Sequence, residues 1–152
     1  MRYALLPLLA ISAIACGTMA SSASLPERAE ALTQDGKYQE AIELYQRHIE
    51  DRLATRSKPE WENPHFYLLK IIDLQLQMSD PQAALNTCKR AKELGVESTL
   101  ISDRYRAIAA WHTERGELTQ AFEVLKTHRQ HDPLLFDALL DKLARKMTAS
   151  GM

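Results

Sequence analysis

The sequence predicts an all-α protein, and three observations support that prediction. Apolar residues recur at helical spacings of three and four between residues 25 and 147. Capping residues or prolines stand before several of these segments and glycines after several of them, as is common at helix boundaries. No stretch shows a convincing alternation of apolar and polar residues, the pattern expected of a half-buried strand. We therefore expect seven helices joined by short turns.

Composition and charge narrow the class of protein. The 152 residues are 45% hydrophobic and 26% charged, which is ordinary for a globular chain, and the length suits one domain. The formal net charge of −1 shows no excess of basic residues of the kind that binds nucleic acid, so we expect no nucleic-acid partner.

The N-terminal residues 1–23, MRYALLPLLAISAIACGTMASSA, have the three parts of a secretory signal peptide. Arg2 supplies a cation, an uncharged apolar run covers 4–15, and small residues follow. The apolar run is shorter than the roughly 20 residues that a membrane-spanning helix needs. The sequence thus predicts an exported protein.

Two kinds of processing remain open at this signal. Cleavage after Ala20 or Ala23 would release a soluble periplasmic or secreted protein. The stretch Ala13–Gly17 resembles the lipobox of bacterial lipoproteins, although that motif usually has leucine where Ala13 stands. Cleavage after Ala15 would then leave Cys16 as an acylated first residue and make the protein a membrane-anchored lipoprotein, held firmly if two or three acyl chains are attached.

The first two helices are expected after a capping signal. Ser24 and Glu27 have the spacing of a capping box, and Pro26 is tolerated in the first turn. The first apolar stripe consists of Leu25, Ala29 and Leu32. Gly36 interrupts this pattern, and a second stripe, ending near Leu53, consists of Tyr38, Ala41, Ile42, Tyr45 and Ile49.

A polar connector at 54–62 separates these helices from the next pair. The dipeptides Asn63-Pro64 and Asp80-Pro81 each supply a cap and a first helical residue. The two apolar stripes that follow them are Leu68, Ile71, Ile72 and Leu76, and then Ala84, Leu85, Cys88 and Ala91. Gly95 suits a left-handed stop after the fourth helix.

Three further helices complete the prediction. Ser98 or Ser102 can cap the fifth helix, and Gly116 ends it. The sixth carries an apolar stripe, and Asp132-Pro133 begins the seventh. The apolar positions of these three helices are Tyr105, Ile108, Ala109 and His112; Leu118, Ala121, Phe122 and Leu125; and Leu135, Phe136, Leu139, Leu140, Leu143 and Met147. We expect a helical domain over 24–147 and a flexible tail over 148–152.

The second, fourth and sixth helices share one frame. The segments GKYQEAIELYQRHI, SDPQAALNTCKRAK and GELTQAFEVLKTHR each place an alanine five residues after the glycine or serine. These alanines are Ala41, Ala84 and Ala121, and four residues later come Tyr45, Cys88 and Leu125. The preceding helices align as well, so the chain contains about three copies of a helix pair.

This pattern resembles the tetratricopeptide repeat family over about residues 25–133. The second helix of that repeat carries alanine followed by an aromatic residue one turn later, and a proline comes after it. The third copy, with Tyr105, Ala109 and Pro133, matches best, and the second copy departs most, with Ser79 and Pro81 in place of glycine and an aromatic residue. The intervals of 43 and 37 residues between the alanines exceed the usual 34. Both excesses fall in expected loops.

The resemblance implies a right-handed α-solenoid of about three helix-turn-helix repeats plus a C-terminal capping helix. Neighbouring helix pairs of such a fold stack and share a continuous core. The last helix carries charges that suit a solvated cap, namely Asp137, Asp141, Lys142, Arg145 and Lys146.

No catalytic constellation stands out in the sequence. There is no glycine-rich phosphate loop, no Gly-x-Ser-x-Gly, no HExxH and no CxxC, and we expect neither an enzyme nor a cofactor. His128 and His131 have a spacing that allows both to reach one metal, with His112 as a third ligand, but packing and helix-end roles explain them more simply. Cys88 is expected to be a buried, inert thiol.

The resemblance also implies a concave groove lined mainly by the first helix of each pair, and such a groove suits an extended peptide or a helix. The residues expected to line it are Glu30, Gln34, Phe66, Leu69, Asp73, Gln77, Arg106, Ala110 and Thr113. A subset of the family grips C-terminal carboxylates of chaperones with paired cations, but only Lys70 is cationic at the matching positions here.

The sequence therefore predicts an exported protein-binding scaffold or adaptor of the cell envelope, with an unknown protein or peptide as its partner. Two alternatives remain. The region of Trp61, Phe66 and Leu69 could pair with another copy, which would make the protein a self-associating structural module. The histidines could support a metal-dependent activity.

Overall fold

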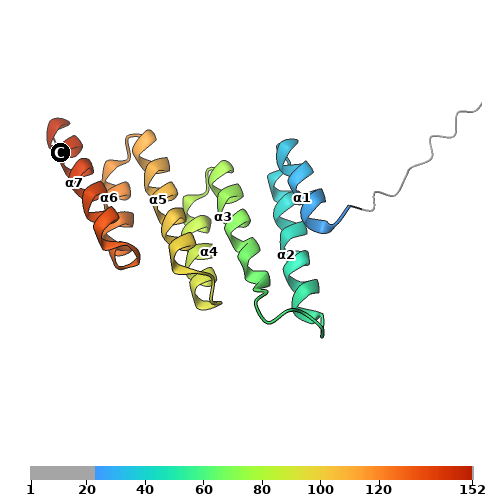
Figure 1. Ribbon diagram of the computed structural model, residues 1–152. Helices are drawn as coiled ribbons and strands as arrows, with labels where there is room; N and C mark the ends of the chain where they lie inside the picture. Colours follow the sequence, from blue (N-terminus) through green and yellow to red (C-terminus); the bar gives the residue numbers. More distant parts are fainter. Residues whose placement is uncertain (1–22, 152) are drawn as a thin grey trace, which may run out of the picture.

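The computed structural model describes residues 23–151, and within them seven α-helices and two short 3-10 helices follow one another without a strand (Figure 1). The α-helices are α1 (Leu25–Gln34), α2 (Tyr38–Ala54), α3 (Leu68–Gln77), α4 (Pro81–Glu93), α5 (Ser98–Glu114), α6 (Leu118–Thr127) and α7 (Pro133–Ala149). The 3-10 helices are η1 (Pro64–Tyr67) and η2 (Arg129–His131). The all-α prediction is confirmed. The predicted signal peptide and Cys16 lie outside the described residues, apart from Ala23.

The helices stand in a row, with α1 and α2 at one end and α7 at the other (Figure 1). Successive helices form three antiparallel pairs, α1–α2, α3–α4 and α5–α6. Each pair contacts the next through α2 and α3 or through α4 and α5, and α3 also contacts α5. The helix α7 packs against α6. Most packing is thus between elements close in sequence.

Polar caps begin four of the helical segments where the sequence places them. The Ser24 N–H donates to Glu27 Oε2 at 2.7 Å while Ser24 Oγ accepts from the Glu27 N–H at 3.5 Å, which completes the capping box. Asp80 Oδ1 accepts from the Ala83 N–H at 2.9 Å, and Asn63 and Asp132 cap η1 and α7 in a similar way. These side chains satisfy backbone donors that lack an intrahelical partner.

Three boundaries differ from the sequence prediction. Neither serine caps α5, because Glu97 occupies the cap position and Ser102, 3% exposed, is buried inside the helix. The segment after Asn63 begins with the tighter turn η1 before α3 starts, a common arrangement at helix N-termini. The last helix continues to Ala149, two residues beyond the predicted end of the helical domain.

The turn between the two helices of each pair has the same backbone geometry. Gly36 and Gly116 adopt φ of +74° and +76°, in the left-handed region that glycine enters without steric penalty. Ser79 occupies the equivalent turn between α3 and α4 and also has a positive φ, +61°. The serine in the least regular copy therefore adopts the glycine-like conformation in spite of its side chain.

One continuous core runs from Ala29 in α1 to Leu143 in α7. The three repeated alanines, Ala41, Ala84 and Ala121, are fully buried, so the helices of each pair can approach closely at these points. Tyr45 fills the space between the first two pairs and stacks on Tyr67 with 5.8 Å between ring centroids.

Candidate functional site

A pocket of about 560 Å³ lies between α5 and α7, with α6 behind it. We call it the α5–α7 pocket. Its lining residues are Arg106, Ala109, Ala110, Thr113 and Glu114 of α5, Leu125 of α6, and Leu139, Lys142, Leu143 and Lys146 of α7. Its volume lies within the range of ligand-binding pockets. Three residues expected to line the groove, Arg106, Ala110 and Thr113, meet here.

The floor of the α5–α7 pocket is apolar. Ala109, Leu125 and Leu143 are 3%, 4% and 5% exposed and belong to the core cluster, and Leu139 packs against that cluster. The small side chains of Ala109 and Ala110 leave room beside α5. An apolar group that entered here would be removed from water at little cost to the protein.

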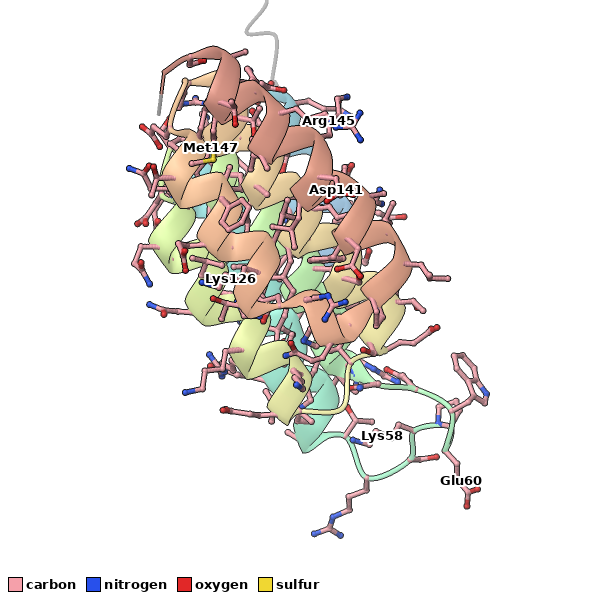
Figure 2. All side chains as sticks on the ribbon, turned by 90° about the vertical axis from the view of Figure 1, so that its left-hand side faces the viewer. Lys58, Glu60, Lys126, Asp141, Arg145 and Met147 are labelled. Carbon is pink, nitrogen blue, oxygen red and sulfur yellow. The ribbon has the colours of Figure 1, made fainter. Side chains whose placement is uncertain are left out.

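The rim of the α5–α7 pocket is mainly cationic. Arg106, Lys142 and Lys146 contribute three positive charges, and Glu114 contributes the one negative charge among the lining residues. Figure 2, which looks at the α7 end of the molecule, shows Asp141 and Arg145 projecting from one edge of α7 and Met147 from the other, toward α6. The sequence pattern alone places Lys142 and Lys146 on a solvated cap, whereas in the structure both line this pocket.

Arg106 is held only partly by its neighbours. One end of its guanidinium pairs with Asp103, three residues earlier on α5. Its Nε is inaccessible to solvent and has no hydrogen-bond acceptor among the described residues. A buried donor without a partner costs about 1–3 kcal/mol, so an acceptor that reached it would be favoured.

Two of the predicted groove residues instead join neighbouring helix pairs. Glu30 of α1 accepts a hydrogen bond from the Tyr45 hydroxyl at 2.8 Å and lies 3.5 Å from Lys70 Nζ of α3. The Tyr45 hydrogen bond, followed by the charge of Lys70, lowers the pKa of the Glu30 carboxyl below its ordinary value. Burial, aided by Glu30, raises the pKa of Tyr45.

Asp73 makes the second of these links. It receives two hydrogen bonds from Arg104 of α5, at 3.1 Å to Nε and 2.8 Å to Nη2. The paired geometry fixes both side chains and connects α3 to α5. Glu30 and Asp73 are thus engaged within the protein, whereas Gln34 and Gln77 are exposed at the C-terminal ends of α1 and α3.

Leu69 does not line a groove. Its side chain is 1% exposed and lies in the core cluster, because the first residues of α3 turn this position toward the neighbouring helices. A charged substitution at Leu69 would therefore unfold the local core rather than report on ligand binding.

Phe66 belongs to a different hollow, of about 440 Å³, at the connector between α2 and η1. The hollow is lined by His48, Trp61, Glu62, Asn63, Pro64, Phe66 and Tyr67. Trp61 is 84% exposed and Phe66 49% exposed. Arg52 anchors the connector by donating from Nε to Glu62 Oε1 at 2.6 Å. The structure therefore separates Phe66 from Arg106, Ala110 and Thr113.

The histidines do not form a three-ligand cluster. Within residues 23–151, no group of three or more His, Cys, Asp or Glu side chains could hold a metal ion. His128 stacks on Tyr105 at 3.6 Å between ring centroids, and His131 lies beside both rings. His112 is seven residues further along α5 than Tyr105, about 10 Å of helix rise, and its Nδ1 lies 2.5 Å from Glu117. Burial lowers the pKa of His128 to about 4.

Cys88 has the environment of an inert core thiol, as the sequence predicted. It is fully buried in α4, and burial raises its pKa to about 12. The reactive thiolate form is correspondingly scarce at neutral pH.

No known family matches this chain in a scan of protein-family models, and a search of curated proteins finds no significant match. Among the described residues, no helix is both long enough and apolar enough to cross a membrane.

Proposed function

We propose that the protein is a binding scaffold that holds a protein or peptide partner along the face formed by α1, α3, α5 and α7. The α5–α7 pocket carries this proposal, because it combines a buried apolar floor with charged side chains at its edge. Such a combination provides both affinity and orientation for a peptide. We propose no catalytic role.

The repeated helix pairs support a finer assignment of the fold. We propose that they form a right-handed α-solenoid of the tetratricopeptide type, capped by α7. The common alanine frame, the shared turn geometry at Gly36, Ser79 and Gly116, and packing between successive pairs all favour it.

We also propose that the protein is exported and acts in the periplasm or at the membrane of the cell envelope. This part rests on the signal-like residues 1–23 and on Cys16 within a lipobox-like stretch. The mass of the mature chain tests it. An N-terminus at Cys16 with added acyl mass indicates a lipoprotein, one at residue 21 or 24 indicates soluble export, and an unprocessed Met1 contradicts export.

Site-specific photocrosslinking tests the scaffold proposal. A photoreactive residue is placed at Thr113 or Gln77 on the proposed face, and at Lys89 of α4 as a control. Both Gln77 and Lys89 are exposed, and Thr113 is partly exposed. We expect the same discrete adducts from Thr113 and Gln77 and none of them from Lys89. Equal adduct patterns at all three positions would contradict a dedicated binding face.

A second candidate function is self-association through the hollow at the connector between α2 and η1, which Trp61, Phe66 and Tyr67 help to line. The exposure of Trp61 and Phe66 favours it, since large aromatic side chains gathered on a surface often mark an interface. Light scattering over a range of protein concentrations tests this idea. A mass that rises with concentration in the wild type and stays monomeric in Trp61→Ser/Phe66→Ser supports it. A concentration-independent monomer contradicts it.

A further inference from the structure

We infer that the α5–α7 pocket selects an acidic segment of its partner in which an apolar side chain is flanked by carboxylates. This inference rests on the proposed scaffold function and adds the chemistry of the ligand. It follows from the charge of the rim, the pairing state of its cations, and the shape of the floor.

The rim is more positive than the chain as a whole. The chain has a formal net charge of −1, whereas the ten residues that line the pocket carry three cations and one anion. Lys142 and Lys146 form no ion pair with the described side chains, and Arg106 pairs only within its own helix. Carboxylates arriving at this rim would therefore meet two lysines that form no ion pair with the described side chains, beside an arginine that is already paired with Asp103.

Helix stability alone does not explain these cations. Lys146 lies in the last turn of α7, where a cation interacts favourably with the helix dipole. Lys142 lies a full turn earlier, beyond the short range of that effect, and faces the same pocket. Arg106 comes from another helix and leaves its Nε without an acceptor within the described structure.

The floor of the α5–α7 pocket determines which side chain of the bound segment lies between its carboxylates. Leu125, Leu139 and Leu143 offer an apolar base, and the absence of bulky side chains at Ala109 and Ala110 allows a peptide backbone to approach α5. An apolar anchor on this floor with acidic neighbours on the rim satisfies both parts of the pocket. A basic segment would instead face three like charges, a repulsion that selects against it.

Fluorescence anisotropy with the full chain and four labelled peptides tests the inference. All four peptides have twelve residues. Three of them have two leucines four residues apart, flanked by glutamate, glutamine or lysine, and the fourth has glutamate flanks with serine replacing each leucine. We expect the glutamate–leucine peptide to bind on the order of tenfold more tightly than the glutamine peptide, and the difference to shrink at high ionic strength. The lysine and serine peptides should not bind measurably.

Matched protein variants locate the effect. Lys142→Glu/Lys146→Glu should weaken the glutamate–leucine peptide on the order of tenfold or more and should gain affinity for the lysine peptide. That gain excludes misfolding as the cause of the loss. Lys37→Glu/Lys89→Glu, which makes the same charge change at exposed positions outside the pocket, should leave binding unchanged. Equal behaviour of the two double variants overturns the inference.

The remaining outcomes separate this inference from the scaffold proposal. One outcome is that the glutamine and glutamate peptides bind equally and that both crosslink to a photoreactive residue placed at Thr113. That result supports the peptide scaffold and contradicts the selection of acidic segments. If dodecanoate binds and no peptide does, the pocket is a fatty-acid site and the inference is wrong. If Lys142→Glu/Lys146→Glu abolishes a concentration-dependent rise in mass, a second copy occupies the pocket, which also overturns it.

Discussion

His128 lies between α6 and η2 and stacks on the ring of Tyr105. This position lowers the pKa of its imidazole. Burial is the main cause of its lowered pKa of about 4, and His131 and Lys92 add like-charge repulsion. The folded protein therefore resists protonation of His128, whereas an unfolded chain takes up that proton near its ordinary pKa of about 6.5. The stability that results is complete above about pH 6.5 and is lost as pH falls toward 4.

We predict that His128→Phe weakens the pH dependence of unfolding, because the variant lacks the proton that the unfolded wild-type chain takes up at His128. Phenylalanine retains a ring that can stack on Tyr105 but does not titrate. Between pH 6.5 and 4, the slope of the unfolding free energy against pH should be smaller than in the wild type by up to about 1.4 kcal/mol per pH unit. Urea titrations at several pH values measure it. Parallel slopes for the two proteins would show that His128 is accessible to protons in the fold.

Individual helices depend on the residue that precedes them. At α7, Asp132 stands before Pro133 and its Oδ1 accepts from the Leu135 N–H at 3.2 Å. The proline sets the backbone for the first turn, while the carboxylate satisfies a free donor and lies at the positive end of the helix dipole. Loss of this side chain should therefore loosen the start of the helix that forms one wall of the α5–α7 pocket.

We predict that Asp132→Ala lowers the unfolding free energy by about 1 kcal/mol, as is typical for the loss of an N-terminal cap. Asp141→Ala removes the same charged group from an exposed position in the middle of α7 and should change stability by less than about 0.5 kcal/mol. Urea unfolding of both variants at neutral pH measures the difference. Similar losses in the two variants would mean that charge, rather than capping, is responsible.

The whole row of helices ends at α7, which has to cover α6. Phe136 of α7 is fully buried in the core cluster, whereas Leu134, two residues earlier, is 88% exposed. The core is continuous from α1 to α7, so a loss at this end removes support from the pocket and from the last helix pair.

We predict that Phe136→Ala lowers the unfolding free energy by about 3–5 kcal/mol, the usual range for truncating a buried aromatic residue. Leu134→Ala is the matched control and should change it by less than about 0.5 kcal/mol. The same denaturant experiment compares them. If Phe136→Ala unfolds the chain entirely, Phe136→Leu should remain folded with an intermediate loss. A negligible loss in both Phe136 variants would contradict the packing of α7 on α6.

Local chemistry allowed much of the helical layout to be predicted from the sequence. Ser24, Asn63, Asp80 and Asp132 cap as expected because a cap depends on contacts within three residues. Gly95 adopts the left-handed conformation expected after α4 for the same reason. Ser102 was misassigned, because a serine in a helical pattern does not show by itself whether its helix has already begun.

The candidate site was only partly predictable. Arg106, Ala110 and Thr113 share one face of α5, so helical spacing placed them together. Leu69 was placed on the surface and is buried, because which face of α3 meets its neighbours depends on the rotation of the whole helix in the row. The sequence does not identify Lys142 and Lys146 as lining residues for the same reason. The rotation of α7 in the row turns the side of the helix that carries them toward the pocket.

Four features follow from local sequence alone: the all-α class, most helix boundaries, the alanine frame and the inert nature of Cys88. They depend on backbone preferences and on apolar periodicity within a few residues. The packing of the helices, in contrast, establishes which charged side chains are paired and which remain available to a partner. Glu30 and Asp73 are engaged by residues 15 to 40 positions away, whereas Lys142 and Lys146 remain beside an apolar pocket. Such pairings depend on how one helix pair is set against the next, and only the packed molecule specifies that geometry.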